Sequence, residues 1–289
     1  MLTGLKFCFN FLTRIPIKAE IEGYSQVANK IYLFPIVGFI TGLIVGFLGY
    51  ILSLIFHPFL VSILTVALLI YITGAHHLDG LMDFGDGLMT FGSPQKKIDA
   101  MHDVAIGTGG FSLAFVILIA TVFSIASSLQ FIFAALIISE ITAKFSMVLI
   151  CSYSKSANTP MATEFIKLNN WKRSLFSFFI LVPLIFIGLY LNFFIYYFLP
   201  KLFSLKFIRV LFGNLIITIF LLIPIIILSL MIALASMLFI RYLSYQNFKG
   251  VTGDCIGALH EITRLITLIV IFLLFSNVNL YKIQYLLLK

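Results

Sequence analysis

Three aspartates stand close together in a short polar segment of an otherwise apolar chain. Asp79, Asp83 and Asp86 are spaced i, i+4 and i+7, so on a helix their side chains share one face. The whole sequence has only eleven acidic residues, and three of them fall within these eight positions. Carboxylates at this density repel one another, and a bound cation removes that cost. The spacing predicts a Mg²⁺ site held by the three aspartates; a solvated acidic face at a helix end is the alternative.

Two histidines begin the same segment. An imidazole beside carboxylates can act as a general base or a metal ligand, and near a membrane it also serves as a hydrogen-bonding group. His76 and His77 are adjacent and no glutamate follows them, so the HExxH pattern of zinc proteases is absent. We expect His77 to be a candidate catalytic group and His76 to be structural.

A second polar cluster runs from residue 99 to residue 110. It contains Asp103 and then the glycines Gly107, Gly109 and Gly110, which lead into an apolar stretch. Glycine-rich turns that enter a helix can hold a phosphate through their backbone N–H groups. This favours Gly107 as a phosphate contact, although glycines that only interrupt a helix are the alternative.

A third polar cluster, residues 250 to 261, lies at the start of the last apolar stretch. Asp254 and Glu261 are seven residues apart and so share a helix face. A carboxylate below the membrane interface is costly unless a metal, a base or a hydrogen bond compensates it. We predict that both complete the site of the three aspartates. The alternative is a helix-capping Asp254 and a local ion pair between Glu261 and Arg264.

The composition of the chain predicts the kind of secondary structure that carries these three clusters. Hydrophobic residues make up 61% of the chain and charged residues 10%, whereas a soluble domain carries about 25% charge. The sequence therefore predicts an all-α, polytopic membrane helix bundle that forms a single domain over residues 1–289. Seven apolar stretches are long enough to span a bilayer, at 31–56, 59–75, 111–128, 130–151, 175–199, 210–240 and 255–278. The stretch 210–240 contains Pro224 and is either one kinked helix or two short ones.

The basic residues predict the orientation of the bundle. With seven helices and a cytoplasmic N-terminus, twelve loop bases lie on the cytoplasmic side and five outside, as the positive-inside rule requires. Bases that flank membrane spans account for the net charge of +8 without nucleic acid, so we expect a lipid bilayer and no polynucleotide as partner. All three clusters then face the cytoplasm from the cell membrane. Carboxylates, glycine turns and bases on one face suit magnesium-dependent phosphoryl transfer.

Several ordered motifs resemble those of the cobalamin synthase family, the adenosylcobinamide-GDP ribazoletransferases. Residues 74–87 resemble the family pattern GGxHxDGLxDxxDG, residues 101–110 resemble MxDxxIGxxG, and residues 250–261 resemble GxTGDxxGAxxE. Residues 11–16 and 34–38 are similar to its N-terminal blocks. Several positions depart from the pattern. Lys144 stands where the family often has arginine, Ala105 where it often has a basic residue, and Arg264 where it has a second acid. Residues 158–161 also lack the glycines expected there.

The resemblance implies transfer of the adenosylcobinamide phosphate moiety from adenosylcobinamide-GDP to α-ribazole or its 5'-phosphate, with release of GMP and with Mg²⁺ as cofactor. It implies catalytic roles for His77, Asp103, Asp254 and Glu261. It also implies substrate or phosphate contacts for Arg14, Lys144, Gly80, Gly87 and Gly107. The sequence is compatible with a homo-oligomer.

Two other functions share these features. A CDP-alcohol-type lipid headgroup phosphotransferase also carries aspartates on membrane helices, but its pattern has Ala-Arg soon after Asp-Gly, where this chain has Leu81 and Met82. A cation or metabolite transporter would distribute its carboxylates near the bilayer midplane. Here they cluster near the ends of the spans, and no inverted repeat is visible.

Overall fold

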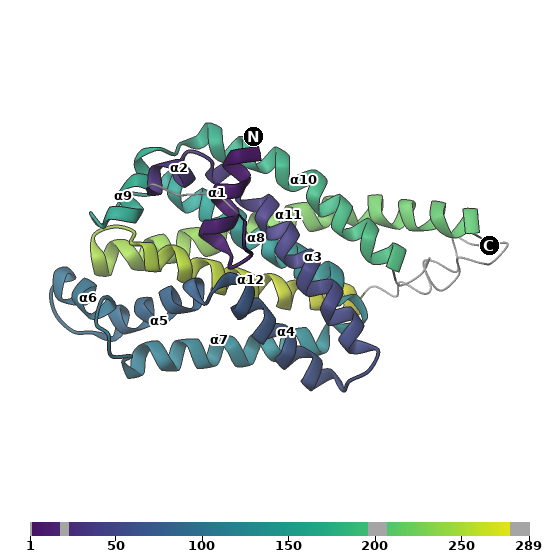
Figure 1. The fold of residues 1–289 in the computed structure, drawn as a ribbon, viewed down its shortest axis with the longest axis horizontal. Coiled ribbons are helices and arrows are strands. Elements are labelled where there is room, and N and C mark those ends of the chain that lie inside the picture. Colours follow the sequence, from purple (N-terminus) through teal and green to yellow (C-terminus); the bar gives the residue numbers. More distant parts are fainter. Residues whose placement is uncertain (1, 18–22, 196–206, 278–289) are drawn as a thin grey trace.

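A computed structural model describes residues 2–17, 23–195 and 207–277, with side chains of the segment that begins at 207 described from Thr218 onward. Within these ranges the chain folds into helices and forms no strand; an isolated bridge joins Ser156 to Val251. The predicted all-α class is therefore confirmed. Figure 1 shows an elongated bundle whose longer helices run roughly along the same axis.

The helices comprise long apolar spans and shorter connecting elements. In chain order they are α1 (Leu2–Leu12), α2 (Tyr24–Ala28), α3 (Phe34–Ser53), α4 (Pro58–Thr73), α5 (His76–Met89), α6 (Pro94–Met101), α7 (Thr108–Ser127), α8 (Ile132–Tyr153), α9 (Pro160–Lys167), α10 (Trp171–Phe193), α11 (Phe207–Phe248) and α12 (Gly253–Asn277). Short 3₁₀ turns precede α3 and α8.

Six described helices are long and apolar enough to cross a membrane, and the chain is an integral membrane protein. A seventh span exists if α4 and α5, which meet at an angle of 93°, are counted as one broken span. The predicted number of about seven is thus confirmed, but the predicted span 59–75 is a helix of only 16 residues. The stretch 210–240 lies within the single continuous helix α11, which tolerates Pro224 in its interior.

Two consecutive left-handed residues make the bend between α4 and α5. Gly74 has φ 69° and ends α4, and Ala75 has φ 62° and precedes α5. Glycine suits the first position because a Cβ atom there would lie 2.8 Å from Cγ of Arg14. Alanine has no such freedom, so its conformation costs energy that the surrounding packing must offset. The bend directs α5, and with it the three aspartates, along the bundle.

Helix α8 occupies the centre of the bundle and is buried over its whole membrane-spanning part. Helices α3, α10, α11 and α12 pack around it. Glycines of α3 allow a close approach, because a Cβ atom at Gly42 would lie only 2.6 Å from Cα of Ile137. The polar side chains of α8 between Ile132 and Cys151 therefore face protein and not lipid.

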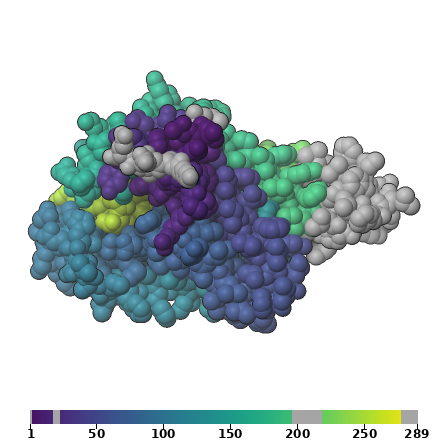
Figure 2. Space-filling view, viewed as in Figure 1, coloured from purple at the N-terminus to yellow at the C-terminus, as the bar shows by residue number. Residues whose placement is uncertain are grey.

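The connections between the helices gather at the two ends of the bundle. Figure 1 shows α6, α9 and the α11–α12 connection at one end, and the α3–α4 and α7–α8 connections at the other. The second and third polar clusters thus lie at the same end, as the seven-span topology predicted. The space-filling view shows α1, in purple, lying across the near face of the bundle (Figure 2).

Candidate active site

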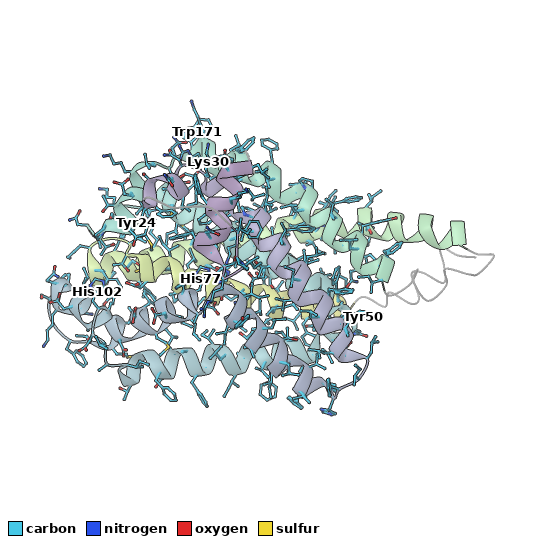
Figure 3. The ribbon with its side chains drawn as sticks, in the orientation of Figure 1. Tyr24, Lys30, Tyr50, His77, His102 and Trp171 are labelled. Carbon is cyan, nitrogen blue, oxygen red and sulfur yellow. The ribbon has the colours of Figure 1, made fainter. Side chains whose placement is uncertain are left out.

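A cavity of about 400 Å³ opens among the polar motifs. It lies between α5 and α12 on one side and α1, α2, α3, α8 and α9 on the other, so it unites both halves of the chain. Its lining consists of Asn10, Phe11, Tyr24, Phe34, His76, His77, Asp79, Gly80, Met147, Cys151, Met161, Phe165, Gly253, Asp254, Ile256 and Gly257. Figure 3 labels two of these, Tyr24 and His77, which come from α2 and α5.

One wall of the cavity carries Asp79 from α5 and Asp254 from α12. The two helices come together at glycines, because a Cβ atom at Gly80 would lie 3.1 Å from Cα of Asp254 and 3.3 Å from Cα of Gly257. The close crossing brings Asp254 of the third polar cluster next to Asp79 of the first. Gly80 therefore shapes the wall that carries both carboxylates.

Asp83 extends this acidic wall along α5. It is half-buried, and it experiences the like charges of Asp254, Asp79 and Asp86. Among the described lysines and arginines, none forms an ion pair with these four aspartates. The wall thus concentrates negative charge without a nearby protein cation.

Asp86 has a different environment from its two neighbours on α5. Its Oδ2 accepts a hydrogen bond of 2.8 Å from the backbone N–H of Gly107, and its Oδ1 accepts one of 2.8 Å from Gly110. These N–H groups belong to the glycine turn that enters α7, so the turn binds a carboxylate of the same chain. Through these two hydrogen bonds, Asp86 of the first polar cluster holds the glycine turn of the second cluster in place.

The hard oxygen donors of the acidic wall fit Mg²⁺. Asp79, Asp83 and Asp254 are carboxylates that form no ion pair with a described lysine or arginine, and a bound divalent cation would compensate their repulsion. Asp86 is less available, since both its oxygens already accept hydrogen bonds. In the described part of the chain, no group of three histidine, cysteine or acidic side chains already stands at ligand-sharing distance, so water or substrate oxygens would have to complete the coordination.

A network of buried charges lies behind the cavity, on α8 and α12. Lys144 is fully buried, and its Nζ atom lies 3.0 Å from Nε2 of His77 and 2.7 Å from Nε2 of His260. Because an ammonium group has only donors, both imidazoles accept through Nε2. His77 lines the cavity, so the network contacts the site through this one ring.

Two carboxylates balance the two buried cations. Arg264 forms an ion pair with Glu261, and its Nη1 lies 3.5 Å from Oε1 of Glu140. Glu140 Oε2 lies 3.9 Å from Lys144 Nζ, and Glu261 Oε1 lies 3.3 Å from Nδ1 of His260. The local pair of Glu261 and Arg264 is thus present, and Glu261 is 2% exposed and does not line the cavity. Charge balance is what allows such groups inside a membrane bundle.

The remaining predicted residues lie outside the cavity. Arg14 is exposed, with its side-chain stem against Gly74, and its backbone N–H donates to the carbonyl of Ile72 over 2.7 Å. Asp103 is exposed on the α6–α7 connection, where its Oδ1 accepts from the N–H of Ala105 over 3.0 Å.

Gly87 packs against other side chains. A Cβ atom there would lie 2.6 Å from Cε of Met101 and 3.1 Å from Cε1 of Phe248. Its role in the structure is therefore close packing.

The aromatic residues of the cavity and two buried partners of Lys144, Glu140 and His260, were not predicted from the sequence. Glu140 and Lys144 stand at i and i+4 in an apolar helix, and ionisable residues inside a span are a functional signal in themselves. That signal could have identified Glu140. His260 is adjacent to Glu261 and carried no separate signal.

Comparison with known proteins identifies relatives over nearly the whole chain. The family model described as cobalamin-5-phosphate synthase matches residues 4–272. The chain is similar to the adenosylcobinamide-GDP ribazoletransferase of Methanococcoides burtonii, with 29% identity over 96% of this chain and 94% of the relative. It is also similar to the protein of the same name from Methanocella arvoryzae, with 32% identity over 93% of this chain and 94% of the relative. No solved structure matches the chain.

Proposed function

The chain belongs to the cobalamin-5-phosphate synthase family, and from this premise we propose that it transfers the adenosylcobinamide phosphate moiety of adenosylcobinamide-GDP to α-ribazole or its 5'-phosphate, with release of GMP. The observation that supports this most is the acidic wall, where Asp79 of α5 and Asp254 of α12 line one cavity. These residues come from two separate polar clusters, which the fold brings to one cavity.

We propose that Asp79, Asp83 and Asp254 hold Mg²⁺, and that Asp86 fixes the glycine turn at Gly107 and Gly110. A bound Mg²⁺ supplies charge neutralisation to a diphosphate that approaches the acidic wall. Without it, three carboxylates would repel the anionic donor substrate. Omitting Mg²⁺ or adding a chelator is expected to abolish turnover while leaving the helical content of the protein unchanged.

The transfer also needs a group that accepts the proton of the attacking ribose hydroxyl. A carboxylate of the wall suits this role, because Nε2 of His77 already accepts a hydrogen bond from Lys144. His77 can instead donate a hydrogen bond from Nδ1 toward a substrate oxygen. Lys144 then acts through His77, since it is fully buried and does not line the cavity.

The donor substrate is larger than the cavity and must also contact exposed residues. Arg14 lies against the α4–α5 bend beside His76, where its guanidinium can reach phosphate oxygens. Asp103 lies in the loop next to the glycine turn and is a candidate contact for the same substrate. We place this face in the cytoplasm of the cell, on the basis of the basic residues in the loops at that end.

An assay of the purified protein in detergent or nanodiscs tests the proposal. Adenosylcobinamide-GDP, α-ribazole and Mg²⁺ together should give GMP and a corrinoid product in equal amounts, and neither substrate alone should release GMP. Release of CMP from a CDP-alcohol, or accumulation of solute in proteoliposomes without any chemistry, would support the two alternative functions.

A further inference from the structure

The cavity has a second wall of a different chemical character. Phe11 of α1 stacks on Phe165 of α9 with ring centroids 5.4 Å apart, and Phe34 of α3 lies 6.2 Å from the same ring. Tyr24 meets Phe11 edge-on at 6.4 Å. The four rings come from four helices, and all of them line the same cavity as Asp79 and Asp254.

The sulfur-containing side chains Met147, Met161 and Cys151 continue this apolar wall. Thioethers pack well against flat aromatic ligands because they are polarisable and adaptable. Among the residues that the structure describes, no lysine or arginine lines the cavity, so a phosphate group inside it would meet carboxylates and would depend on bound Mg²⁺ for its countercharge. The surface suits a ligand with a flat apolar body and a neutral hydroxylated end.

The volume of the cavity indicates which of the two substrates of the proposed reaction fits inside it. At about 400 Å³ the cavity falls in the range of pockets for small molecules, roughly 300 to 1,000 Å³. A corrinoid joined to GDP is several times too large for it. An aromatic nucleoside fits, and its ribose would then lie near the wall that carries Asp79 and Asp254.

We propose that this cavity is the subsite for the acceptor nucleoside, with the benzimidazole base of α-ribazole against Phe11, Phe34 and Phe165 and the ribose turned toward Asp79 and Asp254. The inference rests on the proposed function and adds to it the location of one substrate. The rim residues Tyr24 and Asp79 are exposed, so the nucleoside has a route in. The donor then approaches the same wall from outside the cavity.

Binding measurements on matched variants test the proposal without turnover. Phe165→Leu removes a ring of the cavity, whereas Phe84→Leu removes an equally buried ring that pairs with Phe248 at 5.9 Å and does not line it. An aromatic contact of ordinary strength predicts that Phe165→Leu weakens binding of α-ribazole about three- to tenfold. Phe84→Leu should leave the Kd unchanged, and the Kd of adenosylcobinamide-GDP should stay the same in both. An unchanged Kd for α-ribazole in Phe165→Leu, or a loss confined to the donor, overturns the assignment.

A second measurement uses the wild-type protein and so does not depend on whether a variant folds. Free 5,6-dimethylbenzimidazole should compete with α-ribazole for binding and leave donor binding unchanged. If free 5,6-dimethylbenzimidazole fails to compete and a short-chain detergent displaces α-ribazole, the cavity would instead be a binding site for a lipid chain. Turnover by the wild-type protein is measured separately. If the protein is active but 5,6-dimethylbenzimidazole does not compete with α-ribazole, the subsite alone is disproved. If the protein binds α-ribazole but never releases GMP, the proposed function is disproved.

Discussion

At the scale of single residues, the three aspartates of α5 share one spacing but have two kinds of environment. Asp79 lines the cavity, whereas both oxygens of Asp86 accept backbone N–H groups of the α7 turn. The sequence predicted one face for all three correctly. It could not reveal that Asp86 is engaged, because its partners are backbone groups more than twenty residues away.

The two environments predict different consequences for the same substitution. Asp86→Asn keeps one oxygen that can accept a hydrogen bond, but it removes the negative charge that strengthens both hydrogen bonds at the N-terminus of α7. We therefore expect it to lower the free energy of unfolding by about 1–3 kcal/mol. Asp79→Asn should leave the melting temperature unchanged and greatly reduce turnover. Thermal unfolding and the transfer assay on both variants measure this, and an unaltered melting temperature for Asp86→Asn argues against a structural role.

The buried charges behind His77 make a second prediction for individual residues. Lys144→Met leaves two buried carboxylates with Arg264 as their one cation, which should cost about 3–5 kcal/mol of stability. The double variant Lys144→Met with Glu140→Leu removes an opposite pair and should recover most of that loss. Activity should not return with stability, since His77 still lacks its donor. Full activity in the stable double variant would show that Lys144 has no function beyond charge balance.

At the scale of elements, apolar run lengths predicted most of the helices but not the bend between α4 and α5. The span was expected to continue to residue 75, and the 93° turn requires a left-handed alanine at Ala75, which no propensity rule anticipates. The ambiguity of residues 210–240 had a similar source. Proline breaks helices in water but is tolerated in a membrane bundle where neighbours satisfy the freed backbone groups, and α11 continues through Pro224.

The bend gives a prediction at this scale. Ala75→Gly places the residue type that favours φ 62° at a strained position and should raise the free energy of unfolding by up to about 1 kcal/mol. Gly74→Ala should do the reverse, because its Cβ atom would lie 2.8 Å from Cγ of Arg14 in a left-handed backbone. Chemical denaturation of both variants tests the pair, and stabilisation by Gly74→Ala would contradict the described bend.

At the scale of the whole molecule, the sequence predicted the number of spans, because apolar runs count about seven of them. With this number the second and third polar clusters fall at one end of the bundle, where α6, α9 and the α11–α12 connection lie. The aromatic wall of the cavity was not predictable in the same way. Phe11, Phe34 and Phe165 are three of 32 phenylalanines, and only the folded chain brings them together.

Cysteine labelling measures the orientation of this topology. Single cysteines placed at Lys96 on α6 and at Lys167 on α9 should react from the cytoplasmic side, and one at His57 in the α3–α4 connection should react from outside. The three native cysteines are buried, so the background reaction should be low. Labelling of the first two positions from opposite sides of the membrane would contradict the seven-span arrangement.

If α5 and α12 jointly form the active site of a transferase, GMP release should depend on the aspartate that α12 contributes, and one matched pair of variants measures this. Asp254 lies on the cavity wall next to Asp79, whereas Asp99 is exposed on α6 and accepts a hydrogen bond of 2.8 Å from Nε2 of Gln95. With both substrates and Mg²⁺ present, we expect Asp254→Asn to lose about a hundredfold or more in kcat at an unchanged melting temperature, the scale of a lost catalytic group. Asp99→Asn should retain wild-type kcat. Equal rates of GMP release from the two variants would contradict the claim and separate α12 from the chemistry.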